Sequence, residues 1–258
     1  MIGLGLNIAK SGVAQKVYEP AENPRVWYNE DSIASYGFFT GISTITDMSG
    51  NGLHLQQADT TKQPEVYPVS TSAGSTKTIK FTNDTLINGN LDVLSDLTNF
   101  TIIYAGGNFR NYHMSVYIGD DDTPDNTSSF RLGRASAGSN RLRAILGHNA
   151  NGDFASTLAF QTSGYKDIVY AYKRGTDSSD IYLGLDNGST VSEEQFGISG
   201  LELSFGAGMG LGTNNPDNPD ANGAGNNWMI FEILIYDRDL DAEELENTRK
   251  YLRRKWQV

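Results

Sequence analysis

The chain has 258 residues, 38% of them hydrophobic, with a formal net charge of -11 and no cysteine. A chain of this length and composition can bury the core of one large domain, and without cysteine neither disulfides nor thiolate metal sites hold it together. The acidic balance argues against wrapping nucleic acid or lying on an anionic membrane, because both require a basic surface. We therefore expect no nucleic-acid partner and no membrane insertion.

The first ten residues, MIGLGLNIAK, alternate between apolar and small or polar side chains, which is the period of a β-strand. They have no basic leader and no uninterrupted apolar run, so they do not match a signal peptide, and this indicates folding in a cytoplasm. We interpret residues 1–24 as an N-terminal arm and connector, and residues 25–258 as a single domain. Two roles stay open for residues 1–20: an arm that adds a strand to a neighbouring subunit or assembly, or the first strand of the chain's own sandwich.

Residues 47–52, with the sequence DMSGNG, are a dense turn signal, because Asp and Asn bond their own backbone and glycine permits positive φ. The oxygens of Asp47 and Asn51 are candidate ligands for calcium, which takes about six to eight oxygen donors. The alternative is that these side chains only hold the turn closed. We favour this alternative because no spaced series of carboxylates follows, and we therefore expect no cofactor, with calcium as the alternative.

Short apolar segments bounded by Gly, Asn, Asp or Ser predict a succession of β-strands through the middle of the chain. The segments are too close together for intervening crossover helices, so the sheets should be antiparallel and two of them should pack face to face. Asn187-Gly188 is a strong signal for a hairpin turn. The predicted strands are residues 78–81, 100–105, 114–118, 129–132, 142–146, 167–172, 181–185 and 201–205.

Two polar loops, residues 119–126 and 213–227, are candidate carbohydrate-binding segments. Long loops between strands often carry binding sites, Asp and Asn bond sugar hydroxyls, and aromatic rings stack on sugar rings. The alternative is that both loops are only solvated. The candidate carbohydrate-binding residues are Tyr112, Asp120, Asp121, Asp122, Asn215, Asp217, Asp220 and Trp228.

The C-terminal thirty residues predict a buried strand followed by a helix. Residues 228–236, WMIFEILIY, are apolar and β-branched enough for a strand buried on at least one face. In the helix, Asp241 is the predicted N-cap, Glu244 completes a capping box, and Leu240 and Leu245 form a hydrophobic staple. One side of the helix should face the protein, through Leu245, Thr248, Leu252 and Trp256.

The run from Glu232 to Glu246, EILIYDRDLDAEELE, followed by Tyr251-Leu252 and Lys255-Trp256, resembles the C-terminal signature of laminin-G-like domains in the concanavalin A-like lectin/glucanase superfamily. The versions it is most similar to occur in bacteriophage and bacterial surface proteins. The resemblance implies an all-β fold, an antiparallel β-sandwich of jelly-roll type with one C-terminal α-helix. It continues upstream in Trp27 and in residues 47–55, 63–64, 79–81, 99–103 and 185–186.

Catalytic motifs are scarce. The glucanases of this superfamily carry Glu-x-Asp-x-x-Glu on one strand, whereas Glu232 is followed by apolar residues and is interpreted as a buried, hydrogen-bonded side chain. The three histidines have no zinc-binding spacing, and the glycine-rich residues 206–212 do not lead into a helix that could hold a phosphate. The sequence therefore predicts a protein that is not an enzyme.

Together these features favour a non-enzymatic bacteriophage virion protein, a tail, fibre or capsid-decoration component that binds host surface glycan. Its expected partners are other virion proteins through the N-terminal arm, host glycan and further copies of itself, and its expected location is the virion, with the bacterial cell surface as the alternative. Two other functions stay open. One is a structural particle component without sugar binding, and the other is an atypical glycoside hydrolase whose carboxylates come from separate loops.

Overall fold

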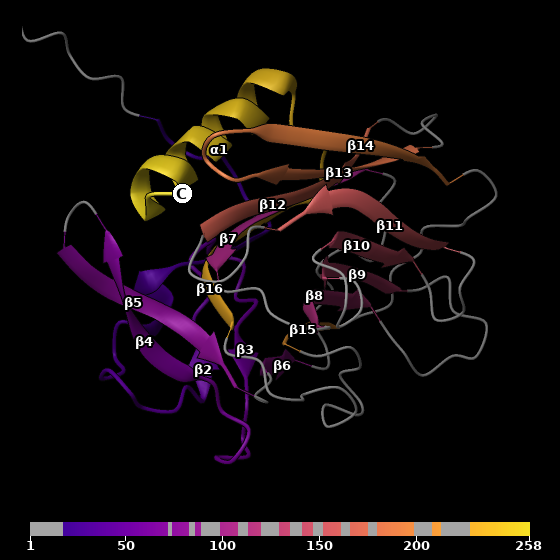
Figure 1. The fold of residues 1–258 in the computed structure, drawn as a ribbon. Coiled ribbons are helices and arrows are strands. Elements are labelled where there is room, and N and C mark those ends of the chain that lie inside the picture. The colour runs from indigo at the N-terminus through magenta and orange to yellow at the C-terminus, as the bar shows by residue number, and fades with distance from the viewer. Residues whose placement is uncertain are drawn as a thin grey trace, which may run out of the picture.

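The structure is a computed structural model, and it describes residues 18–258 except 72–73, 83–85, 89–98, 108–112, 120–128, 135–140, 147–151, 161–165, 175–179, 199–207 and 213–227. In the described residues two antiparallel β-sheets face each other and one C-terminal helix lies outside them (Figure 1). The predicted all-β sandwich with a C-terminal helix is therefore confirmed.

The first sheet, sheet A, carries the last strand and the helix. Its strand order is β14 (Val191–Gly197), β13 (Asp180–Asp186), β12 (Lys166–Lys173), β7 (Phe100–Gly107), β16 (Trp228–Tyr236), β5 (Gly74–Phe81) and β4 (Glu65–Thr71), and β1 (Val26–Tyr28) also pairs with β16. The order of sheet B is β11 (Gly152–Ala159), β10 (Arg141–Leu146), β9 (Ser129–Arg134), β8 (His113–Gly119), β15 (Met209–Leu211), β6 (Leu86–Asn88), β3 (Leu55–Gln56) and β2 (Thr44–Ile45). A short 3₁₀ helix, η1 (Glu30–Ile33), follows β1.

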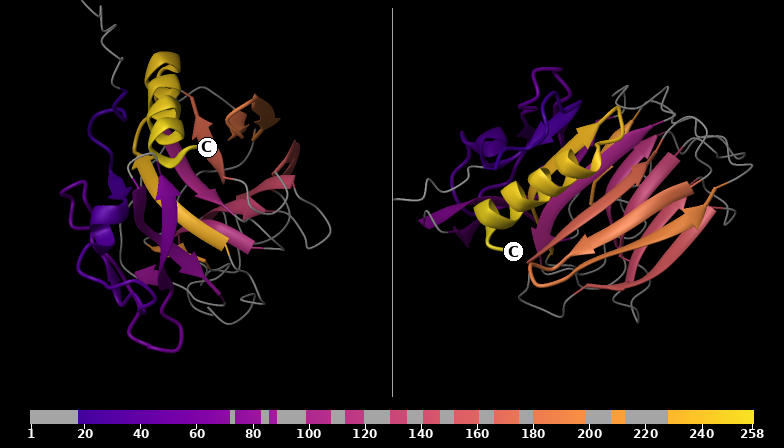
Figure 2. Two further views of the ribbon diagram at one scale, coloured as in Figure 1. Left: turned by 60° about the vertical axis from the view of Figure 1, so that its left-hand side comes forward. Right: turned by 90° about the horizontal axis from the view of Figure 1, so that it is seen from above.

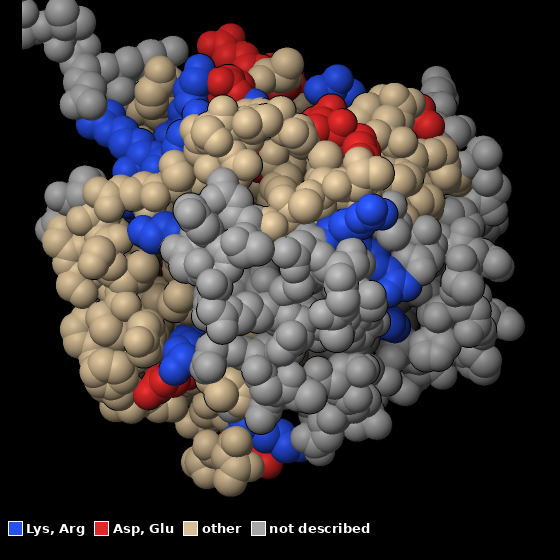
Figure 3. Space-filling view, in the orientation of Figure 1, with Lys and Arg blue, Asp and Glu red and all other residues tan. Residues whose placement is uncertain are grey.

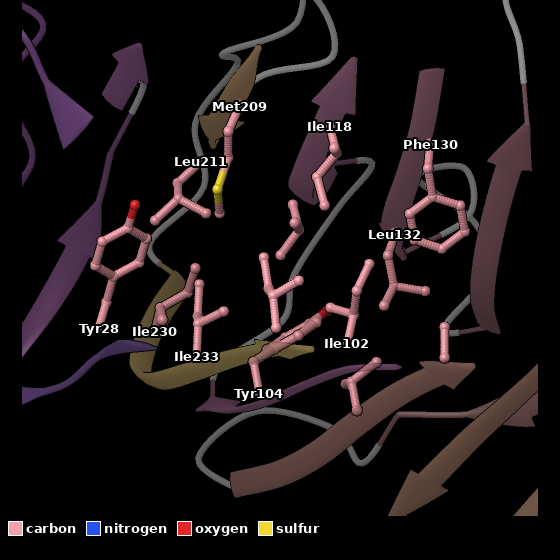
Figure 4. Close-up of a cluster of buried hydrophobic side chains, with 14 of the residues drawn as sticks. Tyr28, Ile102, Tyr104, Ile118, Phe130, Leu132, Met209, Leu211, Ile230 and Ile233 are labelled. Carbon is pink, nitrogen blue, oxygen red and sulfur yellow. The ribbon is translucent and has the colours of Figure 1, made fainter. Parts of the chain in front are cut away.

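Alternate residues of the two sheets fill the space between them. Ile102 and Tyr104 of β7 point toward Phe130 and Leu132 of β9, and all four side chains are fully buried (Figure 4). This alternation is the period of two that the apolar segments predicted. Burial of these side chains is the main source of stability in a sandwich that has no cysteine to cross-link it.

Seven of the eight predicted mid-chain strands fall within observed strands, and the eighth, residues 201–205, lies outside the described residues. The strands that were not predicted include β11 and β14. β14, with the sequence VSEEQFG, alternates between exposed and half-buried positions at the edge of sheet A. Half of its residues face solvent, so its apolar content is too low to mark it as a strand.

Strand β16 contains a β-bulge, at which its register with β7 shifts between Ile230 and Glu232. Ile230 and Ile233 both point into the core between the sheets, while Phe231 belongs to the cluster on the outer face. The extra residue lets two successive side chains, Phe231 and Glu232, point to the outer face. The bulge therefore delivers one carboxylate to the side of the sheet that the helix covers.

Helix α1 (Ala242–Trp256) lies on the outer face of sheet A and contacts β4, β7 and β12 (Figure 2). Its predicted start is confirmed: Asp241 Oδ1 accepts from the backbone N of Glu243 and Glu244, and Glu244 Oε2 accepts from Asp241 N. Leu240 and Leu245 are both buried, as the staple requires. The four side chains of the predicted stripe are the buried residues of the helix, namely Leu245, Thr248, Leu252 and Trp256.

The connector before β1 packs on the same helix. The backbone N of Ala21 donates to Thr248 Oγ1 at 2.9 Å, and the Tyr236 hydroxyl donates to the carbonyl oxygen of Ala21 at 3.0 Å. Residues 1–17 lie outside the described residues, so both roles given to the N-terminal arm, and the boundary at residue 24, stay predictions. Among the described helices, none is long and apolar enough to cross a membrane.

Candidate functional site

Three groups of polar side chains lie on the outer face of sheet A, and the first surrounds Glu232. Glu232 Oε1 accepts from Trp27 Nε1 at 2.7 Å and from the Tyr251 hydroxyl at 2.9 Å. Its Oε2 accepts from Trp256 Nε1 at 2.8 Å and pairs with Lys255 Nζ at 2.9 Å. The carboxylate is fully buried, as predicted for Glu232. All its partners fix the helix and β1 to the sheet, so it cannot reach a substrate.

The second group closes the end of β13 around Asp186, which is also fully buried. Its carboxylate pairs with Arg253 Nη2 at 2.5 Å and Arg249 Nη1 at 3.4 Å, and Oδ1 accepts from the backbone N of Gly188 at 2.9 Å. Gly188 has φ +82°, which confirms the predicted hairpin turn between β13 and β14. This carboxylate joins the hairpin to α1, and both of its oxygens are engaged.

The third group is open to solvent, and we call it the tyrosine surface. It consists of Tyr172 on β12, Arg174 just after it, Tyr182 on β13, and Glu193 and Gln195 on β14. In the register of these strands Tyr172 lies opposite Tyr182, and Tyr182 lies opposite Gln195. Figure 2 shows β13 and β14 beside the helix and not under it, which leaves Glu193, Gln195 and Arg174 exposed and Tyr182 half-buried.

Aromatic rings form the floor of the tyrosine surface. The rings of Tyr172 and Tyr182 are nearly parallel, with centroids 4.8 Å apart and planes 8° apart, and the ring of Tyr170 is parallel to that of Tyr172 at 6.4 Å. Tyr170 lies across Gly184, where an added Cβ would come within 1.9 Å of its Cζ. Glycine at position 184 therefore allows the buried Tyr170 ring to reach across β13 toward Glu193.

Two tyrosine hydroxyls hold the Glu193 carboxylate in place. Tyr172 donates to Glu193 Oε1 at 3.0 Å, and Tyr170 also forms a side-chain hydrogen bond with Glu193. Burial, followed by the charge of Glu193, raises the pKa of both tyrosines well above their usual value. Both hydroxyls therefore stay protonated donors at neutral pH, and they orient a carboxylate whose other side faces solvent.

Arg174 and Gln195 complete the surface. The guanidinium carbon of Arg174 lies 5.0 Å from the centroid of the Tyr172 ring, and Gln195 Nε2 donates to Asp180 Oδ2 at 2.6 Å. Acidic and basic side chains lie close to each other around α1 and β14 (Figure 3). A carboxylate, a carboxamide oxygen and a guanidinium around a half-buried ring can hydrogen-bond hydroxyl groups at the rim of a ligand whose apolar face contacts the ring.

Of the carbohydrate-binding residues predicted from the sequence, only Trp228 is among the described residues. Its side chain is 2% exposed and stacks on Phe81 in the core, with ring centroids 4.4 Å apart. Trp228 is the first residue of β16, and its place in the alternation turns it inward, so it cannot stack on a sugar in this structure. The other predicted residues lie outside the described residues and stay predictions: Tyr112, Asp120, Asp121, Asp122, Asn215, Asp217 and Asp220.

The predicted calcium ligands, Asp47 and Asn51, form a closed turn. Asp47 Oδ1 accepts from the backbone N of Trp27 and Ser49, and its Oδ2 accepts from Ser49 Oγ and from the backbone N of Leu53. Asn51 Nδ2 donates to backbone carbonyls. Because donors surround the Asp47 carboxylate, these residues do not fit a cation, and the turn interpretation agrees with the geometry. In the described part of the chain no group of three or more His, Asp or Glu could hold a metal ion.

Sequence reasoning missed the tyrosine surface because its members are spread over three strands with no motif. A usable signal was nevertheless present. The hairpin at Asn187-Gly188 sets the register of β13 and β14, and this register places Gly184 opposite Glu193. Counting outward from the turn would have placed Gln195 beside Tyr182 on the same face of the sheet.

No model of a known protein family matches the sequence, and no curated protein matches it. Among solved structures, the chain is similar to an arabinofuranosidase complexed with arabinofuranosyl-α-1,2-xylobiose, with a TM-score of 0.62 and 13% identity over 83% of this chain and 51% of that one. It is also similar to a GH54 α-L-arabinofuranosidase soaked with a cyclic sulfate inhibitor, with a TM-score of 0.59 and 12% identity over the same shares of the two chains. A Trypanosoma rangeli sialidase in complex with 2,3-difluoro-KDN has a TM-score of 0.56 and 11% identity, over 91% of this chain and 33% of that one.

The chain thus spans about half the length of the arabinofuranosidases and about a third of the sialidase. At these identities the similarity shows a shared fold. It does not by itself transfer an activity or a substrate, and the predicted laminin-G-like membership stays a prediction.

The comparisons contradict the interpretation as a non-enzymatic bacteriophage virion protein, because the similar structures are carbohydrate-cleaving enzymes and nothing among them indicates a virion. That interpretation depended on the closing strand and helix, which specify a fold and not a biological setting. The prediction that the chain is not an enzyme is contradicted for the same reason. It rested on the absence of a few known motifs, the glucanase carboxylates, zinc-binding histidines and a phosphate-binding loop, and this excludes only those arrangements. The predicted location stays untested.

Proposed function

We propose that this chain is a carbohydrate-active β-sandwich protein, which binds a glycan at the tyrosine surface and cleaves a glycosidic bond with carboxylates from separate segments. The observation that carries the proposal is the exposed Glu193 carboxylate, which two tyrosine hydroxyls orient beside the half-buried ring of Tyr182. A sugar offers an apolar face to the ring and hydroxyl groups to the carboxylate. The shared fold with arabinofuranosidases over 83% of the chain supports the same proposal.

The roles of the residues follow from their exposure. The half-buried Tyr182 ring would contact the apolar face of a sugar. Glu193 and Gln195 would accept hydrogen bonds from the sugar hydroxyls. The exposed Arg174 guanidinium would donate to a hydroxyl or to the carboxylate of an acidic sugar. Tyr172 and Tyr170 would act as positioning residues, because their hydroxyls orient Glu193 and neither ring is open to a ligand.

Cleavage needs two carboxyl groups, about 5–5.5 Å apart in a retaining enzyme and about 6.5–9.5 Å apart in an inverting one. Glu232 and Asp186 cannot serve, since both are fully buried in structural contacts. Glu193 is the carboxylate of the tyrosine surface that can approach a bound sugar. A second group would have to come from another segment, and the acidic loops predicted from the sequence, residues 119–126 and 213–227, are the segments to examine first.

The test is release of reducing ends from arabinoxylan, arabinan and a sialylated oligosaccharide by the purified chain. The wild type should release product from at least one of them, and Glu193→Gln should lower the release because it removes the charged acceptor. Glu194→Gln is the matched control, because Glu194 points to the opposite side of β14 and its carboxylate accepts from the backbone N of Thr157. Failure to release product over this panel, with the fold intact, would refute the proposed cleavage.

A further inference from the structure

A second exposed aromatic group lies at the other end of sheet A, and we call it the aromatic corner. It consists of Phe38 and Phe39 in the loop before β2, Tyr67 on β4, and the flanking pair Glu65 and Lys80. Phe39 is 63% exposed and Phe38 is 44% exposed. Contact of such large apolar side chains with water is unfavourable, and an exposed apolar group of this kind often marks a site that contacts a ligand or a partner.

The backbone holds the Phe39 ring outward in an unfavourable conformation. Phe39 has φ +60°, in the left-handed region that a bulky residue rarely adopts. The loop is fixed there by the edge strand, because Phe39 N donates to the Val66 carbonyl at 2.7 Å and Val66 N donates to the Thr40 carbonyl at 3.0 Å. Glycine or asparagine would relieve the strain at position 39. A phenylalanine that is both strained and exposed is therefore a candidate for function.

Polar groups border the rings closely. The rings of Phe39 and Tyr67 meet at 85°, with centroids 5.8 Å apart, and so form two walls at a right angle. Lys80 Nζ lies 4.6 Å from the Tyr67 ring centroid and 3.5 Å from Glu65 Oε2. Glu65, Tyr67 and Lys80 lie on the outer face of sheet A, because Val66 and Ile79 between them are buried in the core.

We propose that the aromatic corner is a second carbohydrate-binding surface, which holds one sugar ring against Phe39 and Tyr67 while Glu65 and Lys80 bind its hydroxyls. The choice of a sugar as the ligand rests on the proposed function and on the combination of two aromatic rings with one carboxylate and one ammonium group. A sugar ring presents C–H bonds on its faces and hydroxyls around its rim, which matches two apolar walls bordered by an acceptor and a donor. The core of a protein–protein interface is instead depleted of charged residues such as Lys and Glu.

The corner is separate from the tyrosine surface. Five strand-to-strand steps lead from β13 to β4 in sheet A, which is roughly 24 Å at the usual strand spacing. Helix α1 lies between the two, since it contacts both β12 and β4 (Figure 2). One sugar ring therefore cannot touch both surfaces, and a substitution at one of them should leave the other intact.

The test is affinity electrophoresis of the purified chain through gels that contain arabinoxylan or arabinan, with release of reducing ends measured in parallel. Phe39→Gly removes the ring and suits the positive φ, so the variant should fold at least as well as the wild type. It should weaken retardation by about tenfold, the effect of losing one good aromatic contact. Met48→Ala is the control, because Met48 is another exposed apolar side chain, 40% exposed, but lies in the turn that Asp47 holds closed. It should run like the wild type.

The outcomes separate this inference from the proposed function. Weaker retardation of Phe39→Gly, with cleavage of a short oligosaccharide unchanged, supports a second surface. Equal retardation of Phe39→Gly and the wild type overturns the inference but does not contradict binding at the tyrosine surface. A wild type that is not retarded but still releases reducing ends has the same meaning. If Phe39→Gly instead abolishes self-association detected by light scattering and has no effect on retardation, the corner binds a second copy of the chain, and the inference is wrong.

Discussion

Replacing Glu232 by glutamine should destabilise the protein strongly, although the two side chains have nearly the same shape. The carboxylate accepts four hydrogen bonds in a fully buried site, two at each oxygen. The amide group of glutamine is a donor, so one pair of donors would lose its acceptor. Each buried donor left unsatisfied costs about 1–3 kcal/mol, and a buried Lys255 charge without its partner costs more. We expect a loss of about 3–5 kcal/mol.

Equilibrium unfolding in urea at pH 7 measures this loss. Glu22→Gln is the control: Glu22 is exposed, and the substitution should change the free energy of unfolding by less than about 0.5 kcal/mol. Burial opposes the charge on Lys255, but Glu232 and Glu30 together raise the pKa of its ammonium group, so Lys255 stays charged at this pH. A loss below about 1 kcal/mol for Glu232→Gln would refute the view that this carboxylate fixes the helix to the sheet.

Three further predictions concern the same face. Gly184→Ala should lower the free energy of unfolding by about 3 kcal/mol or more, because the added Cβ would overlap the Tyr170 ring. Gly197→Ala should lower it by less than about 1 kcal/mol, because the nearest atom to its Cβ would be Asp180 Oδ1 at 3.9 Å. Unfolding in urea compares the two variants. Asp241→Ala should cost about 1 kcal/mol by removing the N-cap of α1, measured as a lower melting temperature. Burial and a neighbouring carboxylate raise the pKa of Tyr170 and Tyr251 in the folded state. The stability that these two tyrosines contribute should therefore be constant below about pH 10 and fall above it, as the unfolded chain ionises. Phenolate absorbance of these tyrosines at pH 10 without any loss of stability would contradict this assignment.

The closing strand and helix could be predicted from the sequence in detail. Asp241, Glu244, Leu240 and Leu245 lie at spacings that the local geometry of a helix start requires, and the structure places each of them as expected. The central strands of sheet A were equally clear, because sheet B buries one of their faces and helix α1 covers part of the other, and their sequences are therefore almost continuously apolar. Strand β14 was missed because its outward positions are polar.

Features that depend on tertiary contacts could not be predicted. The bulge that turns Glu232 to the outer face leaves no mark in the run WMIFEILIY, and Trp228 takes its inward orientation from its place in this strand. The tyrosine surface depends on the order of strands in sheet A, which joins side chains from three separate segments. The strain at Phe39 depends on its hydrogen bond to Val66, and no local pattern indicates it.

Binding of the purified wild type and the Tyr182→Ala variant to an array of plant and bacterial glycans and sialylated oligosaccharides tests directly whether the tyrosine surface binds a glycan. The wild type should bind at least one class of glycan. Tyr182→Ala, with an unchanged melting temperature, should bind the same class about tenfold more weakly, since the ring that contacts the sugar is gone. Binding of equal strength by the two proteins, or no binding by the wild type, would contradict the assignment of a glycan to the tyrosine surface.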